Sequence, residues 1–231
     1  MPSTWSARLY ITLIVLAGAA AFAVSLAHPV LNDQARFVAL LVVAVVTSRM
    51  KVRLPGMKAN MSVSLPFLLL ASAQLQLLPT LLVALAATVA QSTPRELSRV
   101  RLVQMLFNVS TVLVAITSAY AVQHQIRFAS RGVLLLLGAA VYLLVNTALV
   151  AGIVCLTSEQ GLGRTWAGIF ALTYLYYVLS AGIAGVILGF GIRWSVLLLT
   201  LVVVYGAYRS FQLYFTAMSS TVAPQMASAG D

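Results

Sequence analysis

Two asparagines inside apolar segments are the residues whose type and position offer the clearest chemistry. Asn108 lies in LFNVSTVL and Asn146 lies in LVNTALVA, each within a long apolar stretch. A carboxamide deep in hydrocarbon must find a hydrogen-bond partner. The two amides could join neighbouring helices, at about 0.6–2 kcal/mol per contact, or they could line a pocket that binds a ligand. Their distances from the helix ends predict that both lie in the cytoplasmic half of the membrane, about one helical turn apart in depth.

Hydroxyl and phenol groups in the segment 168–190 form a second polar set. Thr173, Tyr177 and Ser180 follow one another at i, i+4 and i+7, so a helix places them on one face. Together with Asn108 and Asn146 they are the predicted ligand-binding residues. The alternative is that the tyrosines belong to an aromatic belt at the membrane interface.

A stripe of small residues continues the same segment. Ala181, Gly185 and Gly189 recur every four residues, which is typical of closely packed membrane helices. The stripe predicts close packing, either inside the bundle or between two copies in a homodimer.

Groups that could catalyse a reaction are sparse. The sequence has 4 Asp+Glu and 2 His, and all of them fall in predicted loops or in the tail. It contains no paired carboxylates, metal-ligand cluster or glycine-rich phosphate loop, so we expect no catalytic residues, no metal and no cofactor. A lipid-modifying enzyme that binds phosphates through Arg53 and Arg99 would still need a base or a nucleophile. The lack of ionisable groups at depth also argues against a proton-driven pump, although it allows transport of a neutral solute.

The composition explains where these residues must sit. The chain of 231 residues is 61% hydrophobic and 8% charged, whereas a soluble domain carries roughly 25% charged residues. A soluble surface cannot be built from so few charges, so the sequence predicts a membrane protein.

Eight apolar segments predict the helices that hold the polar residues. They run approximately over residues 9–27, 37–48, 64–78, 80–91, 102–123, 133–157, 168–190 and 195–215. The third and fourth are together too long for one crossing, so we expect two short helices hinged at Leu78–Pro79. The predicted fold is an all-α polytopic transmembrane bundle of six to eight membrane segments, with a short or re-entrant hairpin. This domain covers residues 1–216, and residues 217–231 are expected to be a disordered cytoplasmic tail.

Basic residues predict the orientation. The net charge is +10, and the Lys and Arg residues cluster in the loops 49–58 and 92–101. Such loops stay in the cytoplasm, which predicts a bacterial inner-membrane protein with both termini cytoplasmic. The clusters suit anionic lipids better than nucleic acid, for which no recognition motif is present.

The linker 49–65 has an unusual pattern. Apolar and polar residues alternate on both sides of Pro55-Gly56, and this period is typical of strands joined by a turn. We expect an extended, hairpin-like backbone at the cytoplasmic mouth, with a plain basic loop as the alternative.

Several motifs resemble a known family. The stretch VRLPGMKANMSVSLPFLLLASAQLQLLPTLLVALAATVAQ, followed by LVQMLFNVS, YLLVNTALV and VYGAYRSFQLYF, resembles the MASE-like membrane domains that precede bacterial HD-GYP phosphodiesterases and GGDEF cyclases. The resemblance is a loose pattern over nearly the whole chain. It implies a membrane-embedded sensory or small-ligand-binding module. The chain stops about where the output domain of that family starts, so we expect a module without its own catalytic output domain. Signalling through a partner protein, a stand-alone relative and a truncated membrane domain are the alternatives. A weaker similarity to the S subunits of energy-coupling-factor transporters implies the alternative, a transport subunit for a small neutral solute.

Overall fold

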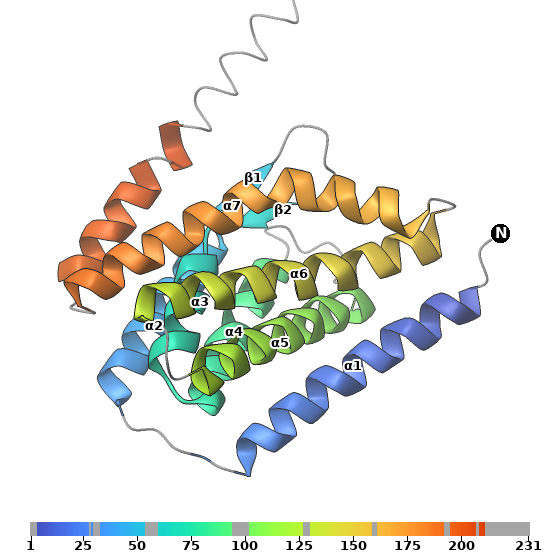
Figure 1. Ribbon diagram of the computed structural model, residues 1–231, viewed down its shortest axis with the longest axis horizontal. Coiled ribbons are helices and arrows are strands. Elements are labelled where there is room, and N and C mark those ends of the chain that lie inside the picture. Colours follow the sequence, from blue (N-terminus) through green and yellow to red (C-terminus); the bar gives the residue numbers. More distant parts are fainter. Residues whose placement is uncertain are drawn as a thin grey trace, which may run out of the picture.

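The computed structural model is a bundle of helices with one pair of short strands (Figure 1). It describes residues 4–27, 29, 33–53, 60–93, 102–126, 130–158, 161–191, 195–206 and 208–210, with only the backbone described at 4, 52, 53, 60 and 61. The elements are α1 (Thr4–Leu26), α2 (Gln34–Ser48), β1 (Lys51–Arg53), β2 (Asn60–Ser62), α3 (Leu65–Gln74), α4 (Leu77–Ser92), α5 (Leu102–Gln125), α6 (Arg131–Thr157) and α7 (Leu162–Phe190). Residues 195–206 and 208–210 are also helical. The predicted helical class is confirmed, and the tail 217–231 lies outside the described residues.

Helix length separates two groups. Within the described part of the chain, 4 helices are long and apolar enough to cross a membrane, namely α1, α5, α6 and α7. The others are apolar but shorter, with 15 residues in α2, 10 in α3 and 16 in α4. Fewer helices of spanning length are therefore present than the six to eight membrane segments expected.

Small residues let the peripheral helix α1 approach its neighbours. A Cβ added to Gly18 of α1 would lie 2.7 Å from the Cβ of Ser110 in α5. On α6, a Cβ at Gly152 would lie 2.4 Å from the hydroxyl oxygen of Tyr10, which donates a hydrogen bond to the Leu149 carbonyl at 3.0 Å. Close backbone approach of this kind is how membrane helices gain packing energy without a hydrophobic driving force.

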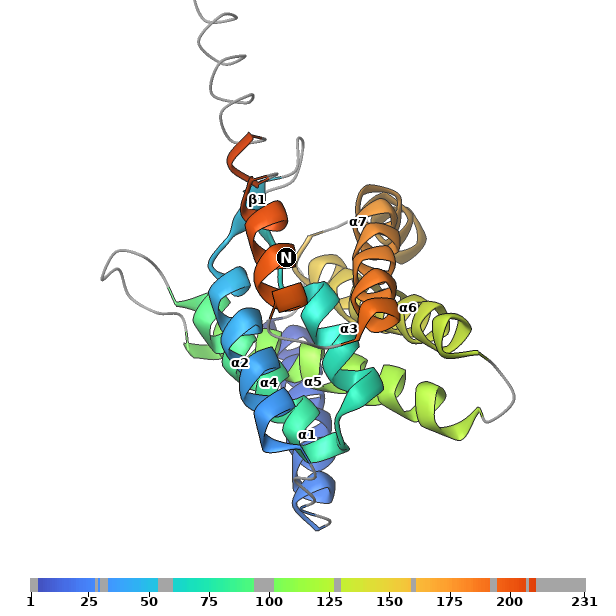
Figure 2. The ribbon, with the colours of Figure 1, turned by 90° about the vertical axis from the view of Figure 1, so that its left-hand side faces the viewer.

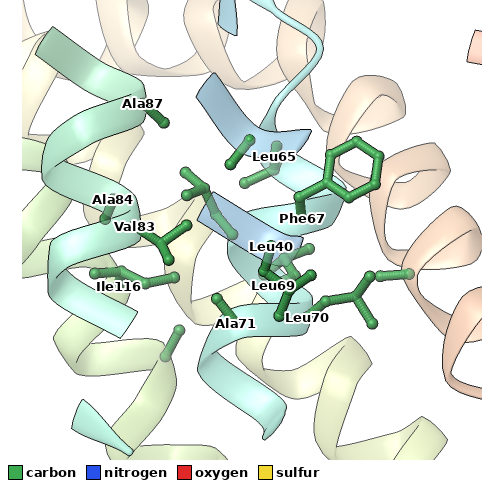
Figure 3. Close-up of a cluster of buried hydrophobic side chains, with 14 of the residues drawn as sticks. Leu40, Leu65, Phe67, Leu69, Leu70, Ala71, Val83, Ala84, Ala87 and Ile116 are labelled. Carbon is green, nitrogen blue, oxygen red and sulfur yellow. The ribbon is translucent and has the colours of Figure 1, made fainter. Parts of the chain in front are cut away.

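The short helix α3 forms the centre of the bundle. It packs against α2, α4, α5, α6 and α7, and Figure 2 shows it between these helices. Every residue from Leu65 to Ser72 is buried. Phe67, Leu69 and Leu70 belong there to one buried hydrophobic cluster with Leu40 of α2 and Ile116 of α5 (Figure 3).

The break between α3 and α4 falls at Leu75–Gln76, so the predicted hinge at Leu78–Pro79 is wrong. Leu75 and Gln76 are extended, with ψ of 164° and 168°. Pro79 is the third residue of α4, where a missing backbone N–H costs no intrahelical hydrogen bond. The Thr80 hydroxyl then joins the two helices by donating to the Ala71 carbonyl at 3.0 Å.

The linker after α2 forms the predicted hairpin-like structure. Strands β1 and β2 pair antiparallel, with Lys51 opposite Ser62, and the pair lies near α7 (Figure 1). This confirms the interpretation of the alternating pattern over the paired residues. The Pro55-Gly56 turn lies outside the described residues.

Candidate functional site

A polar seam between α6 and α7 brings together two of the predicted site residues. The Asn146 Nδ2 donates a hydrogen bond to the Tyr177 hydroxyl at 2.9 Å. Tyr177 is buried, and its ring lies 5.8 Å, centroid to centroid, from the ring of Tyr142. Asn146 therefore has the interhelical partner that an amide at this depth requires.

The predicted face of α7 is the buried face of that helix. Thr173, Tyr177 and Ser180 are all buried, and α7 packs against α6 and α3. The Thr173 hydroxyl donates to the Ile169 carbonyl of its own helix at 2.8 Å, so its bonding capacity is partly used locally. Their common face is confirmed, and their role in ligand binding stays a prediction.

Asn108 does not join this group. On α5 and α6, Gln123 lies directly against Gly138, where an added Cβ would fall 2.2 Å from the Gln123 Nε2. In antiparallel helices this contact places Asn146 near the level of residue 115, so Asn108 is about 10 Å away along the axis, at about 1.5 Å per residue. Asn108 makes no hydrogen bond among the described residues. The predicted separation of about one turn is therefore wrong, because it assumed that the cytoplasmic ends of the two helices lie at the same depth.

A neighbouring tyrosine connects the seam to the strand pair. The Tyr176 hydroxyl donates a hydrogen bond to the Ser62 carbonyl at the end of β2. The Ser62 hydroxyl in turn donates to the Gln91 Oε1 near the end of α4, at 3.0 Å, and lies 2.9 Å from the Ser64 hydroxyl. No pattern in the sequence predicts that Tyr176 and Ser62 form a pair. They are 114 positions apart, and the only local signal was the Ser-x-Ser that ends the strand pattern.

Trp166 closes one end of the seam. Its Nε1 donates to the Thr147 hydroxyl at 3.0 Å, next to Asn146. The Trp166 ring lies 6.0 Å from that of Phe170 on the same helix. The seam thus combines an amide, phenols and hydroxyls in an apolar setting, and these groups can orient a ligand through hydrogen bonds.

The described residues contain no group of three or more His, Cys, Asp and Glu side chains that could hold a metal ion. Comparison of the chain with protein-family models, curated proteins and solved structures gives no match. The resemblance to MASE-like domains therefore stays a prediction. What is shown is a helical membrane protein with a buried polar seam on α7.

Proposed function

We propose that this chain is a sensory or small-ligand-binding module of the bacterial inner membrane, with both termini in the cytoplasm. The observation that carries the proposal is the pair of adjacent tyrosines on α7. Tyr177 bonds to Asn146 in the seam, and Tyr176 bonds to Ser62 at the junction of β2 and α3. A shift of α7 therefore changes the seam and the basic strand pair together.

The free energies of these hydrogen bonds are of the right size for a conformational switch. An intramolecular hydrogen bond contributes about 0.5–1.5 kcal/mol net, and helix shifts of about 1–2 Å are enough to break one. Coupling between sites in allosteric proteins is typically about 1–3 kcal/mol. A ligand of modest affinity that prefers one position of α7 could therefore alter the contact between Tyr176 and Ser62. A partner protein at the basic loops would receive the signal.

We further propose that the α3–α4 hairpin crosses the membrane together with α2, which makes eight membrane segments. Contacts at both ends support this. At one end the Arg36 Nη1 lies 3.4 Å from the Gln74 Oε1, next to the turn of the hairpin. At the other end the Arg49 Nη1 lies 3.4 Å from the Thr93 carbonyl, just after α4. The hairpin thus extends as far as α2 does. Its short helix α3 is shielded by its neighbours, which is where short membrane helices are tolerated.

The variant Tyr176→Phe tests the switch, because it removes the hydroxyl and keeps the ring. We expect hydrogen–deuterium exchange at residues 62–64 to be about two- to tenfold faster than in the wild type, since about 0.5–1.5 kcal/mol of local stability is lost. Tyr174→Phe is the matched control, since Tyr174 is 47% exposed on the same helix. Its exchange should equal that of the wild type.

A ligand screen completes the test. Small polar molecules that raise the melting temperature of the protein in nanodiscs should also change exchange at residues 62–64. That change should vanish in Tyr176→Phe and persist in Tyr174→Phe. If stabilising ligands leave the junction unchanged in the wild type, α7 does not couple the two regions and the proposal is wrong.

A further inference from the structure

A cavity of about 140 Å³ lies between the first turn of α2 and the turn that joins α3 to α4. It is at the opposite end of these helices from the strand pair, because Ser62 and Gln91 mark the other end of the hairpin. Its polar lining comes from Asp33, Arg36, Gln74 and Gln76. None of these belongs to the seam on α7.

The carboxylate in the cavity is already occupied. The Asp33 Oδ1 accepts a hydrogen bond from the Arg36 backbone N–H at 2.9 Å, which caps α2. The Asp33 Oδ2 lies 3.3 Å from the Arg36 Nη2. Both oxygens therefore face Arg36, and a cationic ligand would have to compete with the cap and with the guanidinium.

The two amide oxygens are occupied as well. The Gln74 Oε1 accepts from the Arg36 Nη1 at 3.4 Å, and because a guanidinium can only donate, this fixes the orientation of the amide. The Gln76 Oε1 accepts from the Tyr120 hydroxyl at 3.3 Å.

The amide N–H groups of the two glutamines, in contrast, are available to a ligand. Among the residues that the structure describes, neither Nε2 group of Gln74 and Gln76 has a hydrogen-bond acceptor. Each carries two N–H donors, and the guanidinium of Arg36 has five in all. The cavity thus offers many donors and few free acceptors, which suits a ligand that brings acceptor oxygens.

The size of the cavity and its apolar lining further restrict the class of ligand. Phe37, Leu75 and Pro79 complete the wall with apolar surface. A cavity of about 150 Å³ accepts a molecule the size of benzene, so about 140 Å³ has room for roughly six non-hydrogen atoms. An inorganic anion would leave the apolar wall bare, whereas a short alkyl chain would cover it.

We infer that this cavity binds a small carboxylate with a short apolar tail. The carboxylate accepts from Arg36 and from the amides of Gln74 and Gln76, and such charge-assisted hydrogen bonds are the stronger kind. The inference rests on the proposed function, for which it names the ligand class and the place of binding. Helix α3 ends at Gln74 beside the cavity, and the Ser62–Tyr176 contact lies beyond its other end. A ligand that binds to the Gln74 side chain can therefore move α3 and change that contact.

The test is titration of sodium butyrate into the purified protein in nanodiscs, followed by calorimetry and by saturation-transfer NMR, with empty nanodiscs as the blank. We expect saturable binding that Arg36→Leu and Gln74→Leu weaken at least tenfold. Arg131→Leu is the matched control, since Arg131 is an exposed arginine that opens α6 and does not line the cavity. It should bind butyrate as the wild type does.

Competition with other small molecules tests which chemical group the cavity recognises. Butylammonium and butanol should not displace butyrate, and inorganic phosphate should compete at least tenfold less well. Equal binding of butylammonium or phosphate, no saturable binding to the wild type, or unchanged binding to Arg36→Leu would each overturn the inference. Melting temperatures report whether each variant is folded. If Arg36→Leu is not, Gln74→Leu and Gln76→Leu decide the result.

The outcomes also separate this inference from the proposed function. Failure of butyrate to bind, with another ligand still changing exchange at residues 62–64, overturns the carboxylate site alone. Butyrate that binds at the cavity and leaves that junction unchanged supports the site and contradicts the coupling along α3.

Discussion

At the scale of single residues, the two asparagines differ although their sequence contexts are alike. Both follow an apolar residue and precede a hydroxyl residue within two positions. Asn146 has a phenolic partner on the next helix, and Asn108 is half-buried with no hydrogen bond in the described part of the chain. Helix packing decides the difference, because among the described residues only Asn146 meets a free hydroxyl of a neighbouring helix at hydrogen-bond distance.

The Asn146–Tyr177 bond can be measured by a double-mutant cycle. Asn146→Leu and Tyr177→Phe should each lower the free energy of unfolding, because each leaves a polar group without its partner. The coupling energy should be about 0.6–2 kcal/mol. Denaturant unfolding in mixed micelles measures it, and Asn108→Leu serves as the control, with a change below about 0.5 kcal/mol. Additive single mutants would show that the bond contributes nothing.

Gln123 gives a prediction of opposite sign. Its side chain is buried against Gly138, and neither its Oε1 nor its Nε2 has a hydrogen-bond partner among the described residues. An unsatisfied buried amide costs about 1–3 kcal/mol. Gln123→Leu, which keeps a similar volume, should therefore raise the melting temperature. A lower melting temperature would mean that this amide has a partner after all.

At the scale of elements, the junction between α3 and α4 depends on a side chain rather than on the proline. The Thr80 hydroxyl reaches across to the Ala71 carbonyl, whereas the hydroxyl of Thr88 in the same helix bonds to its own Ala84 carbonyl at 2.8 Å. Both threonines are buried. The Thr80 bond therefore joins α3 to α4. The Thr88 bond stays within α4 and connects no other element.

Replacing these threonines by valine separates the two roles. Thr80→Val should lower the free energy of unfolding by about 1 kcal/mol, because it leaves the Ala71 carbonyl without this donor. Thr88→Val should change it by less than about 0.5 kcal/mol. The same unfolding measurement compares them. Equal losses in the two variants would show that the contact between α3 and α4 adds no stability.

At the scale of the whole molecule, α2, α3 and α4 form a short group beside longer helices. At about 1.5 Å per residue, the 15 residues of α2 extend about 22 Å and the 29 residues of α7 about 44 Å. A hydrocarbon core is about 30 Å thick. Helices as long as α7 must tilt or extend beyond that thickness. The crossing that we propose for the short group would require the bilayer to be thinner around it.

Cysteine labelling checks the orientation and the number of crossings. In a Cys155→Ala background, a membrane-impermeant maleimide added to intact cells should label Ser130→Cys and should not label Ser158→Cys. Gln76→Cys should be labelled, because the turn of a spanning hairpin reaches the outer face. Protection of Gln76→Cys alone would mean a re-entrant hairpin, and the reverse pattern at residues 130 and 158 would reverse the orientation.

Local properties of the sequence determined much of the fold. The lengths of apolar runs placed the described helix ends to within about six residues, since each helix satisfies its backbone hydrogen bonds within its own segment. The strand pair followed from alternation over a few residues on each side of Pro55-Gly56. The shared face of Thr173, Tyr177 and Ser180 followed from the helical period.

The tertiary structure alone decided which of these faces meet. The separation of Asn108 from Asn146, the contact of Tyr176 with Ser62 and the cavity beside Arg36 all join segments far apart in the chain. No local pattern encodes the register between two helices, because it results from how side chains such as Gln123 and glycines such as Gly138 interlock. The two asparagines that look alike in the sequence therefore differ in the folded protein, and the polar groups at the turn of the hairpin become a site only when α2 packs beside them.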